Sequence, residues 1–259
     1  YSEPEPHLNN RRLFCPRGKM IGGCSAHNGM VFVRGNRNDY ERWENFGLKS
    51  WSYEKVLPYF KKIETWSGGE NQYRGSLGPL PVNQSKNDNP LFKAFINSAS
   101  EAGHTVNPDM NGEEQEGFGM FDTTIHEGQR ASATKYYLNP AKKRKNLNIF
   151  SNSFVEKIIF EGKKAIGIEV KIKNKVEKVY AEKEVILSGG SINSPQLLML
   201  SGVGNSDHLR EKGIDVVSDI KGVGKNLQDH LETYIMQECK TPDTLYTYTK
   251  LIPKVLAGI

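Results

Sequence analysis

Eight residues near the start of the chain, Gly22-Gly23-Cys24-Ser25-Ala26-His27-Asn28-Gly29, combine a nearly bare backbone with two polar side chains. Six of the eight are Gly, Ala, Ser or Cys. Glycine lets the main chain approach another group closely. His27 and Asn28 carry nitrogen and oxygen atoms that can bond a ligand. The pattern favours a loop against which a ligand can lie.

A second glycine-containing turn lies at residues 189–190. Residues 185–187 (Val-Ile-Leu) form an apolar run that predicts a strand buried on both faces. Ser194 and Pro195 suit the N-cap and first position of a helix, and Gly202 suits its end. A strand, a glycine turn and a helix N-terminus together let the backbone approach a phosphate or ribose. A tight turn without a ligand is the other interpretation.

The remaining reactive side chains show no site pattern. Cys15, Cys24 and Cys239 are too few and too irregularly spaced for a disulfide framework, and no zinc pattern is present. The histidines outside the loop have no metal-spaced partners, and no Ser-His-Asp arrangement stands out. Asn83-Gln84-Ser85 is a glycosylation sequon that would matter in a secreted protein.

The composition limits the class of protein. The chain has 259 residues, is 37% hydrophobic and has a net charge of +5. No apolar run reaches transmembrane length. The mild positive charge comes without a recognition motif, so we expect no nucleic-acid partner. The chain opens on Tyr1 and closes in mid-pattern, so we expect a piece of a longer protein, incomplete at both ends.

Three segments predict helices. Residues 52–64 place Val56, Phe60 and Ile63 on one face, with Ser52 as a cap and Pro58 in the first turn. Residues 90–104 repeat the pattern and stop at Gly103. Residues 130–141 form the third segment, which we expect to end at Asn139-Pro140. Residues 1–50 are expected to be irregular.

Strand patterns follow from about residue 146. Residues 147–160 contain two short strand-like runs, and residues 165–173 alternate apolar and polar side chains. The sequence therefore predicts a β-meander over residues 147–187 that ends in the interior strand at 185–187.

Three stretches taken together, residues 17–43, 189–204 and 223–230, resemble the glucose–methanol–choline oxidoreductase family of flavoproteins. The first two are similar to the family's signature stretches almost position for position. Residues 74–82 and 130–141 also resemble family segments, in the right order. The run from Val33 to Glu64 is most similar to the insect and choline-dehydrogenase-like branches.

The resemblance implies an α/β fold in which an FAD-binding α/β domain is interleaved with a substrate domain built on an antiparallel sheet. Residues 1–45 and 147–232 would belong to the FAD-binding domain. Residues 65–145 and 233–259 would belong to the substrate-binding domain. Family members oxidise alcohols by moving a hydride to flavin N5, so FAD is the implied cofactor.

The resemblance also explains the bare loop. A flat tricyclic ring needs a wall without side chains, which Gly22 and Gly23 would supply. Asn28 would offer its amide to the pyrimidine edge of the ring, and Val155 would meet the adenine through its backbone. His27 matches a position that in some members bonds covalently to the flavin. A packed, hydrogen-bonded histidine is the alternative. The residues that the resemblance assigns to cofactor binding are Met20, Gly22, Gly23, His27, Asn28, Gly29, Met30, Val31 and Val155.

Two family features have no counterpart in this sequence. No GxGxxG unit precedes Tyr1, and nothing after residue 231 matches the family's catalytic histidine pair. We therefore expect no catalytic residue in this chain, and a base beyond Ile259. The implied partners are an alcohol or sugar substrate and an electron acceptor such as oxygen or a quinone. The alternatives are an FAD-containing lyase of the hydroxynitrile lyase kind and a non-catalytic flavin-fold protein.

Overall fold

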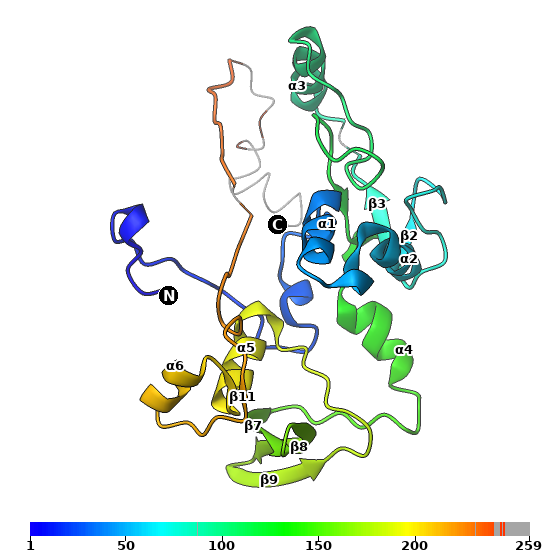
Figure 1. Ribbon diagram of the computed structural model, residues 1–259. Coiled ribbons are helices and arrows are strands. Elements are labelled where there is room, and N and C mark those ends of the chain that lie inside the picture. Colours follow the sequence, from blue (N-terminus) through cyan, green and yellow to red (C-terminus); the bar gives the residue numbers. More distant parts are fainter. Residues whose placement is uncertain (87, 231, 241–243, 245, 247–259) are drawn as a thin grey trace. The chain divides into compact units, whose positions relative to one another are not determined.

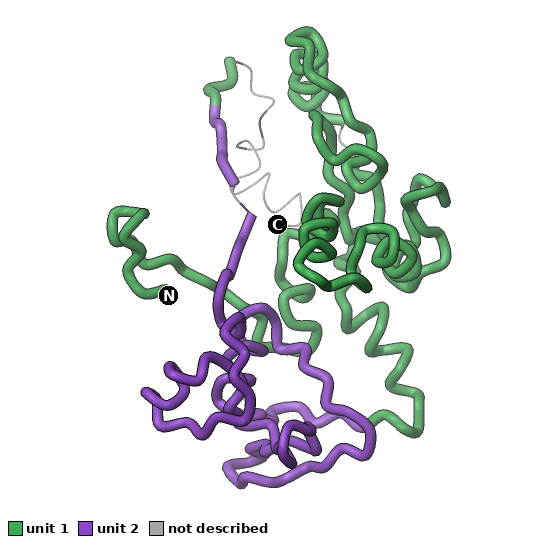
Figure 2. The backbone as a smooth tube through the Cα atoms, viewed as in Figure 1, with its two compact units in different colours: residues 1–147, 237–259 green, residues 148–236 purple. Residues whose placement is uncertain are grey.

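The structure is a computed structural model that describes residues 1–86, 88–230, 232–240, 244 and 246. It contains two compact units (Figure 2). Unit 1 comprises residues 1–147 and the residues from 237 onward, and unit 2 comprises residues 148–236. Both units combine short helices with small sheets, so the chain is mixed α/β, as the sequence predicted.

The helices of unit 1 are short and have clear local signals (Figure 1). They are α1 (Arg37–Asn45), α2 (Tyr53–Ile63), α3 (Pro90–Glu101) and α4 (Asn139–Ala141), with 3-10 turns at Pro6–Leu8, Gly23–Ala26 and Lys49–Trp51. The predictions for α2 and α3 are confirmed. Ser52 is the N-cap of α2, and Gly103 adopts a left-handed φ of 82° beyond α3. Pro58 lies inside α2 rather than in its first turn.

Helix α1 contradicts the expectation that residues 1–50 are irregular. Asn36 caps it, because its side chain accepts a hydrogen bond from the Asn38 N–H at 2.9 Å. Arg37 pairs with Glu41 one turn later, at 2.8 Å. No residue of α1 is buried. The helix was missed because a cap and a charge pair define it, not an apolar stripe.

The helix predicted over residues 130–141 begins later, because Arg130 lies on the short strand β6 (Gln129–Arg130), and it does not stop at Asn139-Pro140. A π turn covers Thr134–Leu138 and continues into α4, which contains Pro140. In the π turn the Asn139 N–H donates to the Thr134 carbonyl, five residues back. The wider turn relieves the clash that a proline ring makes with the preceding α-helical turn. The helix can therefore pass through Pro140.

Four strands of unit 1 form one sheet with the order β1-β4-β3-β2. They are β1 (Val31–Phe32), β2 (Glu64–Trp66), β3 (Leu80–Gln84) and β4 (Asp122–Thr123). Only the β2–β3 pair is parallel. Val82 and Trp66 are buried in this sheet. A separate hairpin joins β5 (Ile125–His126) to β6 (Gln129–Arg130).

Unit 2 is built on an antiparallel meander with the order β7-β8-β9. The strands are β7 (Ser153–Glu161), β8 (Lys164–Ile172) and β9 (Lys175–Tyr180). Helix α5 (Gly190–Leu200) packs against β7, and α6 (Ser206–Glu211) follows the short strand β10 (Val203–Gly204), which pairs in parallel with β11 (Ser218–Asp219). The buried apolar residues of unit 2 are Ile158, Val170, Val203 and Leu209.

The meander is confirmed for residues 153–180, but the interior strand at 185–187 is wrong. These residues form no strand, and Ile186 is 75% exposed. An interior strand needs a partner on each side. Among the described residues none pairs with this run, and only Val185 and Leu187 are partly covered.

Helix α5 also begins earlier than predicted. Gly189 is its N-cap, and Ser194 and Pro195 lie inside the helix. The Ser194 hydroxyl accepts a hydrogen bond from the Gly189 N–H at 3.0 Å, so it supports the turn without being the cap. Gly202, with φ of 88°, follows the last turn as expected.

Within the described residues, no helix combines the length and apolar character that a membrane crossing requires. Among the described residues, no disulfide joins any of the three cysteines. The sequon asparagine, Asn83, lies in β3 and its side-chain amide donates to the Ile125 carbonyl. A glycan on Asn83 would have to break that contact.

Candidate functional site

The glycine-rich loop of unit 1 folds as a single tight turn. The 3-10 segment Gly23–Ala26 follows Gly22, which has φ of 95°. The N–H groups of His27 and Asn28 both donate to the Cys24 carbonyl, at 3.1 and 2.8 Å. The backbone bonds are therefore satisfied inside the turn.

The glycines of this region serve two different purposes. A β-carbon on Gly22 would lie 2.5 Å from the Thr134 hydroxyl, and one on Gly18 would lie 2.5 Å from the Gly23 carbonyl. These two glycines allow the chain to pack on itself. A β-carbon on Gly23 or Gly29 would meet no atom within 4 Å. Those two glycines therefore leave open wall where a flat ring could lie.

Ser25 anchors the loop to the segment that begins the π turn. Its hydroxyl donates to the Gly22 carbonyl at 2.6 Å and accepts from the Ala133 N–H at 3.0 Å. The nearby Thr134 hydroxyl is buried without a hydrogen-bond partner among the described residues. The loop thus rests on residues more than a hundred positions later in the chain.

Arg130 donates hydrogen bonds to the C-terminal part of the glycine-rich loop. Its Nη1 donates to the Asn28 carbonyl at 2.6 Å, to Asn28 Oδ1 at 2.8 Å and to the Ser25 carbonyl at 3.4 Å. Asn28 Oδ1 also accepts from the Met30 N–H at 3.2 Å. Sequence reasoning missed Arg130, Ser25 and Ala133 as supports. The only signal was the likeness of residues 130–141 to a family segment, which carried no role.

Met30 adopts a left-handed φ of 63°, which is rare for a bulky side chain. Its carbonyl accepts from the Thr124 N–H at 2.8 Å and from the Thr124 hydroxyl at 3.3 Å. A backbone held in this region costs about 1–3 kcal/mol and persists only where the surroundings fix it. Such positions cluster at ligand sites.

The other predicted ring neighbours are open to solvent. Met20 is 57% exposed, and His27 and Val31 are also exposed. The His27 imidazole forms no hydrogen bond within the described part of the chain. One loop of unit 1 thus contains seven of the predicted residues, namely Met20, Gly22, Gly23, His27, Asn28, Gly29 and Met30, and Val31 begins β1 directly after it.

Val155, the ninth predicted site residue, lies on β7 in unit 2. Among the described residues β7 is an edge strand, so part of its N–H and C=O row is unpaired. A β-bulge follows directly, between Val155 and Lys157. Val155 lines a cavity of about 480 Å³ in unit 2.

Val155 and Gly189, which belong to two separate features of the sequence analysis, both line this cavity. Its walls include Val155, Ile168 and Leu197, and its rim includes Ser188 and Gly189. An apolar slot beside an edge strand can take a flat aromatic ring such as adenine, which offers both donors and acceptors. Ser188 and Gly189, directly before α5, line the same cavity as Val155.

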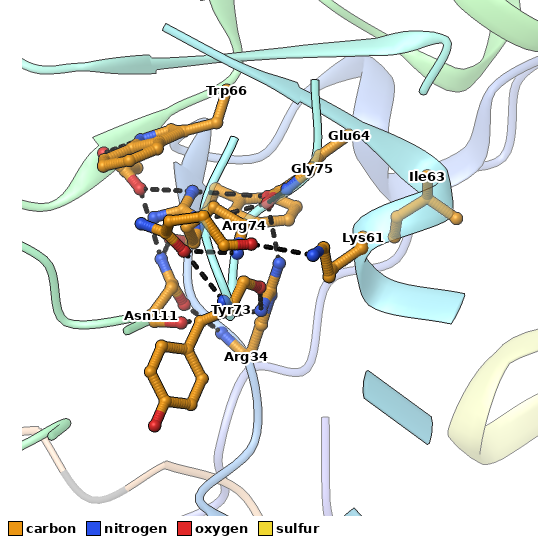
Figure 3. Close-up of polar contacts among 12 residues, drawn as sticks. Arg34, Lys61, Ile63, Glu64, Trp66, Tyr73, Arg74, Gly75 and Asn111 are labelled. Carbon is orange, nitrogen blue, oxygen red and sulfur yellow. Dashed lines mark hydrogen bonds and ion pairs between the residues drawn. The ribbon is translucent and has the colours of Figure 1, made fainter. Parts of the chain in front are cut away.

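A buried ionic cluster ties down the strand that follows the loop (Figure 3). Arg74 and Glu64 are completely buried, and Glu64 Oε1 accepts from Arg34 Nη2 at 2.7 Å and from Arg74 Nε at 3.0 Å. Arg74 also pairs with Asp109 at 2.5 Å and with Asp122 at 2.8 Å. We refer to Arg34, Glu64, Arg74, Asp109 and Asp122 as the ionic cluster.

The two arginines of the ionic cluster are affected differently by their surroundings. Burial lowers the pKa of Arg34, and the charge of Glu64 only partly offsets this effect. Burial would also lower the pKa of Arg74, but hydrogen bonds and charges of Glu64 and Asp122 together raise it. The ionic cluster thus pairs two buried arginines with three carboxylates and holds separate segments of unit 1 together.

Asn111 connects the ionic cluster to β1. Its Nδ2 donates to the Phe32 carbonyl at 3.1 Å and to Asp122 Oδ2 at 3.3 Å, and its Oδ1 accepts from the Arg34 N–H at 2.7 Å. The strand that leaves the glycine loop is therefore fixed by a buried network rather than by its own two residues.

The pattern that defines GMC oxidoreductases matches residues 6–232. The chain belongs to the GMC oxidoreductase family. Over its whole length it is 51% identical to the oxygen-dependent choline dehydrogenase of Brucella ovis and 49% identical to the mitochondrial choline dehydrogenase of Homo sapiens. It spans 47% and 44% of these proteins, or about half of their length.

Solved GMC-like structures share the fold. An FAD-dependent oxidoreductase from Chaetomium thermophilum superposes with a TM-score of 0.82 at 33% identity. The match covers 88% of this chain and 42% of the chain of that protein. A pyridoxine 4-oxidase from Mesorbium loti superposes with a TM-score of 0.79 at 30% identity, covering 84% and 43%. The family resemblance seen in the sequence is confirmed.

Proposed function

We propose that the natural protein is an FAD-dependent oxidoreductase that oxidises the alcohol group of a choline-like compound. The observation that carries this proposal is the identity of about half of all residues, along the entire chain, to proteins named choline dehydrogenases. The proteins with these names favour a choline-like substrate over glucose.

The described residues suit an FAD molecule. The open wall at Gly23 and Gly29 fits a flat ring, and the exposed Asn28 and His27 border it. The cavity along Val155 fits an adenine. When bound, FAD would supply the acceptor for the hydride that leaves the alcohol carbon. The chain's own contribution is to hold and orient the cofactor.

In this proposal the chain contributes to two domains, and each domain is made of two separate segments. Residues 1–45 and 147–232 serve the flavin, and residues 65–145 and 233–259 serve the substrate. Much of the last range lies outside the described residues. No residue of this chain is assigned to take the alcohol proton, since no side chain near the loop forms an acid–base pair among the described residues.

A spectrum of the complete natural protein tests the proposal. We expect flavin absorption bands that bleach when choline is added without oxygen, while glucose leaves them unchanged. Reoxidation by air, compared with reoxidation by a quinone dye, then identifies the electron acceptor. Bands that no alcohol bleaches, together with cleavage of a cyanohydrin, would instead indicate a lyase. A spectrum without flavin bands would contradict the proposed function altogether.

A further inference from the structure

The side-chain amide of Asn28 is held in one orientation. Its Oδ1 accepts from Arg130 Nη1 at 2.8 Å and from the Met30 N–H at 3.2 Å. With the amide reversed, the NH2 group would face these two donors: the Met30 N–H would lose its acceptor, and Arg130 Nη1 would keep only the Asn28 and Ser25 carbonyls. Two donors that face each other cannot form a hydrogen bond, so the observed orientation is preferred. The oxygen therefore points to Arg130, and the NH2 group points away from it.

The Nδ2 atom of Asn28 has no partner within the described part of the chain. Asn28 is exposed, and the neighbouring Gly29 faces open space. The side chain can thus act toward a ligand only as a hydrogen-bond donor. It suits an acceptor atom or a group that gains negative charge.

Arg130 is placed by a rigid hairpin. Glu127 and Gly128 both have positive φ, 51° and 71°, as in the two-residue turn that joins twisted strands tightly. Arg130 then pairs in register with Ile125. None of the described carboxylates forms an ion pair with Arg130. Its positive charge is therefore not neutralised beside the loop.

We propose that Arg130 is a positioning residue that fixes Asn28 as a donor toward the flavin and places a positive charge behind it. This inference rests on the proposed function. Reduction of the flavin places negative charge on the pyrimidine side of the ring. A fixed donor backed by a cation stabilises that charge without having to reorganise. Arg130 should thus raise the tendency of the flavin to accept electrons while touching only the protein.

The test uses the complete holoprotein and measures the midpoint potential of its flavin. In Arg130→Met we expect the reduction equilibrium constant to fall about tenfold, equal to about 30 mV for a two-electron couple. Arg144→Met is the matched control, because Arg144 is exposed and forms no ion pair among the described residues. It should leave the potential unchanged. An unchanged potential in Arg130→Met would overturn the inference.

A double variant separates positioning from bulk charge. If Arg130 acts through Asn28, Arg130→Met should lower the potential less in an Asn28→Ala background than in the wild type, because only the charge is then lost. Additive shifts would show that the arginine acts by its charge alone and would overturn the positioning role.

If Arg130→Met does not fold or does not bind FAD, the midpoint potential of Asn28→Asp is measured instead. The carboxylate keeps its bonds to Arg130 and Met30 but lacks the free donors, so the potential should fall, and an unchanged value refutes the inference.

The outcomes also distinguish this inference from the proposed function. A wild-type protein without flavin bands means that the proposed function has failed, and the role of Arg130 fails with it. A flavin-containing wild type whose potential is unaffected by the Asn28 and Arg130 variants leaves the proposed function intact and removes only the positioning role.

Discussion

Individual glycines near the loop can be told apart by what surrounds them. Gly18 faces backbone atoms of Gly23, whereas Gly29 faces nothing. Neither has a left-handed φ, so replacing either glycine with alanine tests only whether there is room for a methyl group and adds no backbone strain. Gly23 is less suitable, because its φ of 53° would strain any side chain.

The first prediction compares Gly18→Ala with Gly29→Ala in the complete protein. Gly18→Ala should destabilise the apoprotein by about 1–3 kcal/mol, because the methyl group overlaps backbone that has to move. Gly29→Ala should leave apoprotein stability unchanged and lower the ratio of FAD to protein. Thermal unfolding of the apoprotein and the flavin absorbance report the two effects. Full FAD content in Gly29→Ala would show that the ring does not lie there.

The second prediction concerns His27, whose exposed imidazole has no partner among the described residues. We expect a covalent bond from His27 to the flavin methyl group. After acid denaturation of the complete holoprotein, flavin fluorescence should stay with the polypeptide, and the peptide that contains His27 should gain mass. His27→Asn should release all of its FAD. Complete release from the wild type would leave His27 as a neighbour only.

At the scale of elements, one hydroxyl couples α5 to the meander of unit 2. The Ser201 side chain accepts from the Ile158 N–H at 2.8 Å and donates to the Leu197 carbonyl at 2.6 Å. Ser201 is 1% exposed. It therefore satisfies an N–H on β7 that β8 does not reach.

The third prediction is that Ser201→Ala loosens this contact. The Ile158 N–H is left buried and unsatisfied, which costs about 1–3 kcal/mol. Hydrogen exchange at Ile158 should speed up, and the urea midpoint of the complete protein should fall. Ser151→Ala, at an exposed serine of the same unit, is the control and should change neither. Equal exchange in both variants would contradict the coupling.

Elements with strong local signals could be predicted from the sequence. Helices α2 and α3 have a cap and an apolar stripe within twelve residues. The start of α5 could not, because Ser194 carries the residue type of a cap while its hydroxyl serves Gly189 from inside the helix. The run at 185–187 was mistaken for a strand because its apolar pattern does not reveal whether a pairing partner exists.

At the scale of the whole molecule, the ionic cluster joins segments of unit 1 that are far apart in sequence. Glu64 alone receives bonds from Arg34, Arg74 and the Gly75 N–H. Removing one partner of a buried pair leaves charge that water cannot reach. The stability of unit 1 should therefore depend strongly on this carboxylate.

The fourth prediction compares two glutamates that both pair with arginine. Glu64→Gln should destabilise the complete protein by about 3–5 kcal/mol, because the buried Arg34 loses its ion-pair partner and Arg74 keeps only Asp109 and Asp122. Glu54 pairs with Arg37 at 2.5 Å, but its side chain is 61% exposed. Glu54→Gln should cost about 0–1 kcal/mol. Urea unfolding monitored by tryptophan fluorescence measures both. Similar midpoints for the two variants would contradict a central role for the cluster.

The candidate site, like the fold, could be predicted from the sequence only in part. Eight of the nine proposed cofactor residues come from one signature stretch, residues 17–43, and therefore lie close together in the loop and at the start of β1. The ninth, Val155, lies on β7. The supports were not predictable, because Arg130 and Asn28 lie 102 positions apart and Arg34 and Asn111 lie 77 apart. No spacing rule connects such pairs. Only the folded chain shows which arginine is structural and which faces the site.

Strand β9 leaves all six of its residues exposed, at the open side of the meander. An unpaired edge invites strands of other molecules to add to it. Three of the six residues are charged, namely Lys175, Glu177 and Lys178. Another strand docking there would have to strip water from two ammonium groups and a carboxylate. We therefore expect the charges on β9 to oppose aggregation along this edge when newly made copies of the chain meet.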